Sequence, residues 1–204
     1  MDSEQLYTIE NLCTSQIKEK GSKFIGYLYP FENETELDKI LTELKKVHKT
    51  ARHFCLAYRI GTNNPYERFK DDGEPSGTAG KPILSMLQKY GLSNALLVVV
   101  RYFGGTLLGT GGLAKAYKDS ANEAILKATL VELHNIITAK LICGPEEINL
   151  CMKLLKENNA KILSQEFVTK YYIEANFIEE DFTKMVEKLN SYYETTIELI
   201  KLTP

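Results

Sequence analysis

The glycines of this 204-residue chain are concentrated in one stretch, and this placement restricts the fold more than any other feature of the sequence. Nine of the 13 glycines lie between residues 73 and 112, on both sides of the apolar run Ala95–Val100. A short apolar run bounded by glycine-rich turns is typical of a buried strand. We therefore expect a sheet with a buried strand that leads into a tight, glycine-lined connection.

Positive charge is concentrated in the same part of the chain. The whole sequence has a net charge of −2, but residues 45–118 carry 12 Lys and Arg against four acidic residues, a local net of +8. The rest of the chain therefore has a net charge of −10. A basic segment of this kind favours contact with an anionic partner such as nucleic acid. The composition, 44% hydrophobic and 25% charged, excludes a disordered or collagen-like chain.

The sequence is typical of a cytoplasmic protein without a membrane partner. Its longest aliphatic run, Ala95–Val100, is far shorter than the roughly 20 residues that span a bilayer. The N-terminus has no basic start followed by an apolar stretch, so no secretory signal is expected. Cys13, Cys55, Cys143 and Cys151 form no CxxC pair, which favours free thiols over disulfides or a zinc site. The sequence leaves the oligomeric state open.

Hydrophobic periodicity divides the chain near residue 130 and predicts an α+β protein. The expected N-terminal domain covers residues 1–132, with strands at 7–9, 24–28, 54–60 and 96–100 and helices at 34–46, 82–90 and 112–127. Residues 135–204 alternate as β-α-β-β-α-β, the order of a ferredoxin-like sandwich. No catalytic constellation is visible in this second domain.

Two segments carry residues suited to anion binding, Glu67–Pro82 and Arg101–Gly112. The second leads from the expected buried strand into a helix start, where glycines let backbone N–H groups approach a ligand and the helix dipole favours an anion. The alternative is that the glycines only permit a tight turn and close helix–sheet packing. The candidate anion- or nucleic-acid-binding residues are Arg59, Arg68, Lys70, Lys81, Arg101, Gly104, Gly105, Thr106, Gly109, Thr110, Gly111, Lys115 and Lys118.

The same segments do not match the common nucleotide-binding fingerprints. Lys81 is followed by Pro82, where a Walker A loop requires Ser or Thr. The glycines of residues 104–112 do not give GxGxxG in a suitable register. The sequence therefore gives little support to ATP or NAD binding.

The candidate catalytic residues are His53, Asp72, Glu74 and Ser76, which an enzyme would bring together in one cleft. Each also has a simpler explanation. A strand histidine is usually structural, the carboxylates suit a solvated turn or pairing with nearby arginines, and Ser76 lacks the first glycine of a GxSxG motif. Asp71, Asp72 and Glu74 offer oxygens of the kind that Mg²⁺ prefers, but without EF-hand spacing. We expect no cofactor and no metal site.

Residues 67–82 and 98–112, together with 20–26 and 51–59, resemble the YigZ/IMPACT family. The resemblance covers residues 15–130, and the following β-α-β-β-α-β unit looks like the second domain of the bacterial members, similar in fold to C-terminal domains of elongation factor G. It implies an N-terminal two-layer α/β domain of the type found in a ribosomal small-subunit protein, elongation factor G domain IV and the GHMP kinases. It also implies a link to translation, because IMPACT relatives regulate translation initiation under amino-acid stress.

Together these features predict a non-enzymatic regulatory or binding protein linked to translation. Its partner would be RNA, a ribosome-associated surface or another phosphate-bearing ligand, bound by the basic, glycine-rich face of the N-terminal domain. The fold relationship to kinases does not transfer catalysis. Two alternatives stay open. One is a small-molecule hydrolase or phosphoryl-transfer enzyme using the four candidate catalytic residues, and the other is a protein-docking module acting through the C-terminal domain.

Overall fold

The structure is a computed structural model that describes residues 5–62, 64–192 and 198–202. The chain forms two compact units, Met1–Leu133 and His134–Pro204. Both units combine helices with a sheet, so the mixed α/β class expected from the sequence is confirmed.

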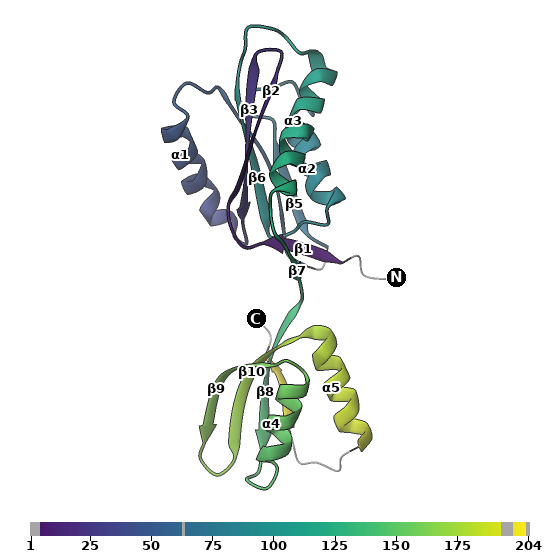
Figure 1. The fold of residues 1–204 in the computed structure, drawn as a ribbon. Coiled ribbons are helices and arrows are strands. Elements are labelled where there is room, and N and C mark those ends of the chain that lie inside the picture. Colours follow the sequence, from purple (N-terminus) through teal and green to yellow (C-terminus); the bar gives the residue numbers. More distant parts are fainter. Residues whose placement is uncertain (1–4, 63, 193–197, 203–204) are drawn as a thin grey trace. The chain divides into compact units, whose positions relative to one another are not determined.

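A five-stranded antiparallel sheet forms the centre of the N-terminal unit (Figure 1). The apolar run identified in the sequence lies in its middle strand, and residues 95–100 have no exposed surface. Burial on both faces explains why this strand is continuously apolar. In spatial order the strands are β2 (Cys13–Glu19), β3 (Ser22–Pro30), β6 (Ala95–Tyr102), β4 (His53–Ile60) and β5 (Tyr66–Lys70).

Helices cover both faces of this sheet. On one face lies α1 (Leu37–Val47), which follows a single 3-10 turn at Glu34–Glu36. On the other face lie α2 (Gly80–Lys89) and α3 (Gly109–Leu126) (Figure 1). Side chains alternate along β6, so this strand contributes to two hydrophobic cores.

The alternation assigns each β6 residue to one core. Leu97 and Val99 pack in the core beneath α2 and α3. Val98 and Val100 pack in the core beneath α1, together with Phe54 of β4. Residues directly opposite each other on paired strands lie on the same face of the sheet, so the core of one residue gives the face of its partner.

Helix α3 approaches the sheet closely because small residues line the contact. A Cβ atom added to Gly26 of β3 would lie 2.6 Å from Ser15 Oγ and 3.0 Å from Ser120 O. The Ser15 hydroxyl donates a 2.8 Å hydrogen bond to the Ser120 carbonyl. The buried alanines of α3, including Ala121 and Ala124, leave room for this approach.

The strands that the sequence analysis missed are polar edge strands or very short. Strand β5 forms one edge of the large sheet, and most of its residues are exposed. Strand β7 (Leu130–Leu133) is four residues long and pairs in a separate two-stranded sheet with β1 (Leu6–Ile9), which the sequence did predict. A strand that buries little apolar surface carries a weak hydrophobic pattern, so periodicity does not identify β2, β5 or β7.

The C-terminal unit has a four-stranded antiparallel sheet in the order β11–β8–β10–β9. Its core contains Leu141, Phe177 and Met185, among other apolar residues. The elements in chain order are β8 (Ile136–Cys143), α4 (Ile148–Glu157), β9 (Lys161–Phe167), β10 (Tyr171–Ile178), α5 (Glu179–Tyr192) and β11 (Glu198–Leu202).

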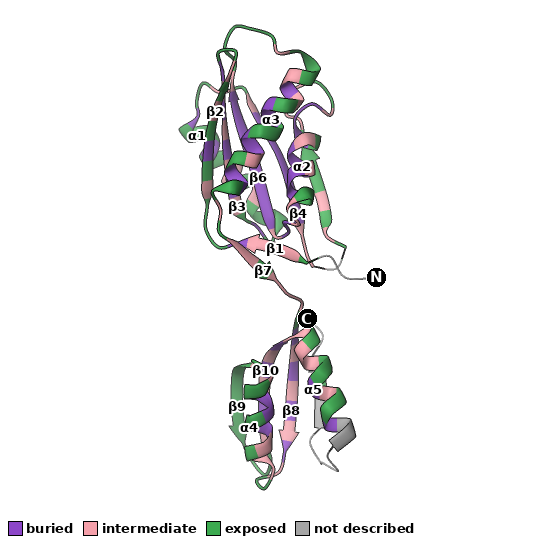
Figure 2. Cartoon of the chain, turned by 45° about the vertical axis from the view of Figure 1, so that its right-hand side comes forward, coloured by how far each residue is buried: buried purple, intermediate pink, exposed green. Residues whose placement is uncertain are grey.

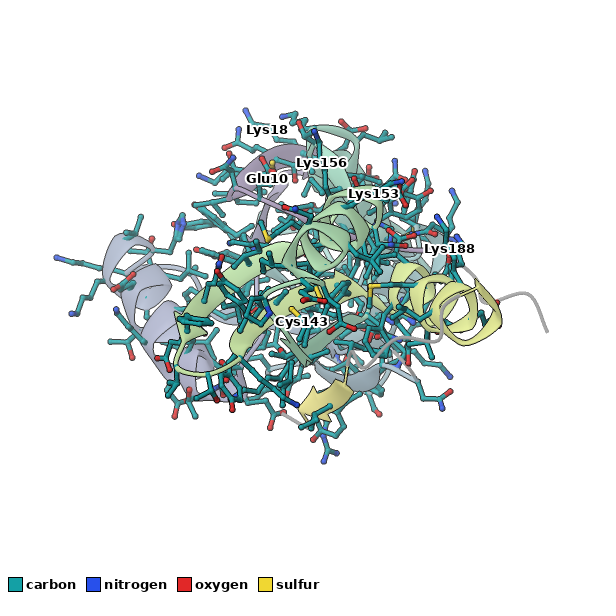
Figure 3. The ribbon with its side chains drawn as sticks, turned by 90° about the horizontal axis from the view of Figure 1, so that it is seen from below. Glu10, Lys18, Cys143, Lys153, Lys156 and Lys188 are labelled. Atoms are coloured by element: carbon teal, nitrogen blue, oxygen red, sulfur yellow. The ribbon has the colours of Figure 1, made fainter. Side chains whose placement is uncertain are left out.

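An exposed ion pair joins the two helices of this unit. Lys188 Nζ of α5 lies 2.9 Å from Glu157 Oε2 of α4, and Lys153 of α4 lies 3.8 Å from Glu157 Oε1. Figure 3 labels Lys153 and Lys188, whose side chains are both exposed. The hydrogen bond from Lys188 holds the pKa of the Glu157 carboxyl below its usual value.

Strand β9 is exposed along its whole length, as its green colour in Figure 2 shows. Leu163 and Phe167 are about half exposed. The protein-docking alternative would use a surface of this kind, and it stays a prediction. Within the described residues, no helix has both the length and the apolar character needed to cross a membrane.

Candidate functional site

A buried ion pair joins the two motif segments. Arg101 Nη1, at the end of β6, lies 2.6 Å from Glu74 Oε1, and the two side chains are only 5% and 4% exposed. The Tyr117 hydroxyl of α3 donates a 2.7 Å hydrogen bond to the same carboxylate oxygen. Charge-assisted hydrogen bonds away from water are strong and directional, so this network fixes the turn around Glu74 against β6 and α3.

Tyr117 is the member of this network that the sequence analysis did not identify. The tyrosine has no exposed surface and lies on α3 beside the small residues Ala116 and Ser120. Its ring packs edge-to-face on Phe24, with centroids 5.1 Å apart. Burial raises the pKa of Tyr117, which keeps its hydroxyl protonated as a donor.

Asp71 holds the start of α2 in place. Its Oδ1 accepts hydrogen bonds from the backbone N–H groups of Ala79 (3.0 Å) and Gly80 (2.8 Å), and its Oδ2 accepts one from Gly77 (2.8 Å). A carboxylate at this position satisfies otherwise unpaired helix N–H groups and suits the helix dipole. The acidic residues of this turn therefore have structural partners.

The three acidic residues of the turn do not converge. Asp72 Oδ2 accepts a 2.8 Å hydrogen bond from Phe54 N, whereas Asp71 faces α2 and Glu74 faces Arg101. In the described part of the chain, no group of three or more His, Cys, Asp or Glu side chains is arranged to hold a metal ion.

The candidate catalytic residues are not arranged as a nucleophile and its base. His53 Nδ1 lies 3.0 Å from the Asp72 carbonyl oxygen, and Ser76 is exposed. No hydrogen bond joins His53 to Ser76 in residues 5–62 and 64–192. Glu74 is occupied by Arg101. The enzyme alternative stays a hypothesis, and the arrangement that would favour it is not found among these residues.

Two of the candidate anion-binding arginines point inward. Arg59 is 9% exposed, its Nε lies 2.8 Å from Glu67 Oε1, and its Nη1 donates to the Leu92 carbonyl at 2.8 Å. Arg101 is similarly enclosed by its pairing with Glu74. Both guanidinium groups therefore already have protein partners.

The remaining basic candidates lie on opposite faces of the sheet. In the pairing of β5 with β4, Lys70 lies directly opposite Leu56 and Arg68 directly opposite Tyr58. Leu56 and Tyr58 both belong to the core beneath α1. Alternation therefore puts Lys70 and Arg68 on the α1 face. Lys81 and the two candidate lysines of α3 belong to the helices on the other face.

Three of the candidate lysines line one pocket, which we call the α2–α3 pocket. It has a volume of about 370 Å³ and lies between the start of α2 and the second and third turns of α3. No carboxylate is among its lining residues, so its charged groups are all positive. It is lined by Gly77, Lys81, Pro82, Ser85, Ala114, Lys115 and Lys118.

The glycines that lead into α3 serve two different purposes. A Cβ atom on Gly104 would lie 1.9 Å from the Gly21 carbonyl carbon, so this glycine permits a close backbone contact. Its N–H donates to Ser22 Oγ at 3.2 Å. By contrast, Cβ atoms on Gly105 and Gly111 would meet open space. Close packing therefore accounts for Gly104, and the turn accounts for Gly105 and Gly109, whose φ angles of +88° and +70° favour glycine. Gly111 has neither of these reasons to be glycine.

The first turn of α3 is open to solvent. Thr106, Gly109 and Thr110 are exposed, no side chain caps the helix, and its first turn has no acidic residue. The N–H groups of a first helical turn lack intrahelical partners and favour an anion. This helix start thus adds donors to the same end of α3 that carries Lys115.

Comparison with known proteins identifies the family of the N-terminal unit. The family model of the Impact N-terminal domain matches residues 20–125. The IMPACT family member YigZ of Escherichia coli (strain K12) is 35% identical over 150 residues, which are 72% of this chain and 74% of that protein. The IMPACT family member YvyE of Bacillus subtilis (strain 168) is 41% identical over 126 residues, and the match spans 62% of this chain and 58% of that relative.

One solved structure extends the likeness to both units. A crystal structure described as that of a hypothetical protein aligns with 98% of each chain, at 29% identity and a TM-score of 0.69. A structure described as that of the two-domain translational regulator Yih1 aligns with 62% of this chain and 47% of that one, at 25% identity and a TM-score of 0.36.

Proposed function

The chain belongs to the family of the Impact N-terminal domain, and from that membership we propose a regulatory, non-enzymatic protein linked to translation. In this proposal, RNA is the ligand, and the α2–α3 pocket and the adjoining start of α3 bind its phosphates. The link to translation is supported by family membership, since the family resemblance implies control of translation. The choice of RNA is supported by the chemistry of the pocket.

One observation carries the RNA proposal. Lys81, Lys115 and Lys118 line a single pocket that has no carboxylate. Most exposed lysines of a folded protein are simply solvated, but three that line one pocket with no carboxylate in its lining make this part of the surface positive, and such a field attracts anions. Phosphate contacts of this kind provide most of the non-specific affinity of a protein for nucleic acid.

The pocket also indicates how selective such binding would be. Its charged groups are lysines, which recognise phosphate as point charges, and its other residues include Pro82 and Ala114. Phosphate contacts fix position and orientation but carry no sequence information. We therefore expect affinity for RNA with little preference for sequence.

Charge reversal tests the proposal. We compare the wild type, the variant Lys115→Glu/Lys118→Glu and the control Lys18→Glu/Lys39→Glu for binding to fluorescent single-stranded and double-stranded RNA. The two variants have the same net charge, and all four lysines are exposed. The pocket variant should lose roughly tenfold or more in affinity, and the control should lose much less, because it affects only long-range attraction.

The opposite outcomes are equally clear. If the wild type binds neither single-stranded nor double-stranded RNA at low salt, the RNA-binding proposal is wrong. An equal loss of affinity in both variants would mean that net charge, and not this pocket, determines binding.

A further inference from the structure

A second basic pocket lies over the α1 face of the sheet, and we call it the α1-side pocket. It has a volume of about 380 Å³. Phe54, one of its lining residues, belongs to the core beneath α1, whereas the α2–α3 pocket is formed by helices on the other face. The two pockets are therefore separate sites. The lining residues are Lys45, His48, Lys49, Ala51, Arg52, Phe54 and Asp72.

The charge of this pocket is positive and largely uncompensated. Lys45, Lys49 and Arg52 are exposed, and none of them forms a salt bridge within the described residues. Asp72 is the one acidic lining residue. Its Oδ2 accepts the Phe54 N–H at 2.8 Å and its Oδ1 lies 3.6 Å from Lys70 Nζ, so this carboxylate already has partners.

The dipole of α1 explains only part of this charge. Lys45 lies in the last turn of the helix, where a cation is favourable, and its Nζ lies 5.8 Å from the centroid of the Phe54 ring. Lys49 and Arg52 come after the helix, which ends at Val47. Capping of the helix dipole therefore gives no reason for two of the three cations.

His48 gives the pocket a rigid and neutral floor. Its side chain is buried, with Nε2 2.6 Å from the Tyr27 hydroxyl and Nδ1 2.8 Å from the Tyr102 hydroxyl. Burial, aided by the positive charge of Lys23, lowers its pKa. Because both ring nitrogens are already hydrogen-bonded, recognition of a ligand falls to the three cations around the opening.

We propose that the α1-side pocket binds a group of linked phosphates, such as a di- or triphosphate, independently of the α2–α3 pocket. Lys45, Lys49 and Arg52 supply three positive charges to the pocket lining, and the planar guanidinium of Arg52 offers paired donors to phosphate oxygens. The lining has little apolar surface beyond Ala51 and Phe54, which suits a compact polyanion better than an apolar ligand.

Binding of inorganic tripolyphosphate at constant ionic strength tests the site. The readouts are calorimetry and the NMR signal of the Phe54 amide, which donates to Asp72 at the pocket. We expect this signal to shift on titration, and the variant Lys49→Gln/Arg52→Gln to bind at this site at least tenfold more weakly. The control Lys115→Gln/Lys118→Gln removes the same charge from the other pocket and should leave the Phe54 response within twofold of the wild type.

Competition with RNA identifies the source of the phosphates. Single-stranded RNA without terminal phosphates displaces tripolyphosphate from this pocket if the ligand is an RNA backbone, and does not displace it if the ligand is a free polyphosphate. If the Phe54 signal does not change on titration, or if the two double variants lose tripolyphosphate affinity equally, the α1-side pocket is not the binding site. The single variant Lys49→Gln repeats the test if the double variant does not fold. These results are independent of the RNA-binding test at Lys115 and Lys118.

Discussion

Replacing Glu74 with glutamine tests whether the ion pair between the two motif segments stabilises the N-terminal unit. The glutamine has nearly the same shape, and its carbonyl oxygen can still accept the hydrogen bond from Tyr117. The substitution therefore removes charge while preserving most of the packing. It leaves the guanidinium of Arg101, which is 5% exposed, without its negative partner.

The size of the effect follows from this burial. Removing one partner of a buried ion pair costs about 3–5 kcal/mol of unfolding free energy, mainly because the other charge stays buried and unpaired. For a unit of this length, that corresponds to a decrease in Tm of roughly 10–18 °C. The double variant Glu74→Gln/Arg101→Met should recover part of the loss, because it leaves no charge buried beside Phe24.

Urea unfolding followed by circular dichroism measures these differences. The control is Lys70→Gln, which breaks the pair with Asp72, where the lysine side chain is 62% exposed. An exposed pair contributes at most about 1 kcal/mol, so the control should change stability little. If Glu74→Gln costs no more than this control, the argument that burial makes the Arg101 pair essential is wrong.

Three further predictions concern backbone packing, pH and thiol chemistry. Gly104→Ala should lower the Tm strongly in a thermal melt, because its Cβ would lie 1.9 Å from the Gly21 carbonyl carbon. The pKa of His48 is lowered from 6.5 in the folded protein, so the contribution of this residue to stability is complete above about pH 6.5 and decreases as the pH falls below that value. The unfolding free energy measured at about pH 7.5 and about pH 5.5 should show this loss in the wild type and not in His48→Gln. Burial raises the pKa of the Cys55 thiol, so mass spectrometry after brief alkylation should find Cys13 modified and Cys55 unmodified until the protein is unfolded.

The sequence was informative wherever an element buries a regular apolar face. The run Ala95–Val100 predicts the central strand, and the spacing of apolar residues predicts α1. Both predictions succeed because periodicity reflects burial directly. The sequence did not predict strand β5, because its position at the sheet edge leaves most of its side chains in solvent.

The candidate site was predictable only in part, because pairing in space does not follow from position in the sequence. The lysines of the α2–α3 pocket were identified from local charge, and the structure brings Lys81 and Lys115 together. The sequence raised pairing of the turn carboxylates with arginines as one alternative, but local charge could not select the pair of Glu74 with Arg101, 27 residues away in the chain. The α1-side pocket was missed because Lys49 and Arg52 belong to no anion-binding motif in the sequence, and it is the fold that places them beside Phe54 and Asp72.

The dependence of RNA affinity on salt tests the central claim most directly. For wild type and Lys81→Gln/Lys115→Gln/Lys118→Gln, the logarithm of the affinity for single-stranded RNA is plotted against the logarithm of the salt concentration. Phosphate contacts at the α2–α3 pocket predict a steep negative slope for the wild type, and a slope smaller by about 0.7 for each lysine that loses its contact. A flat wild-type response, or an unchanged slope in the variant, would contradict the proposed role of this pocket.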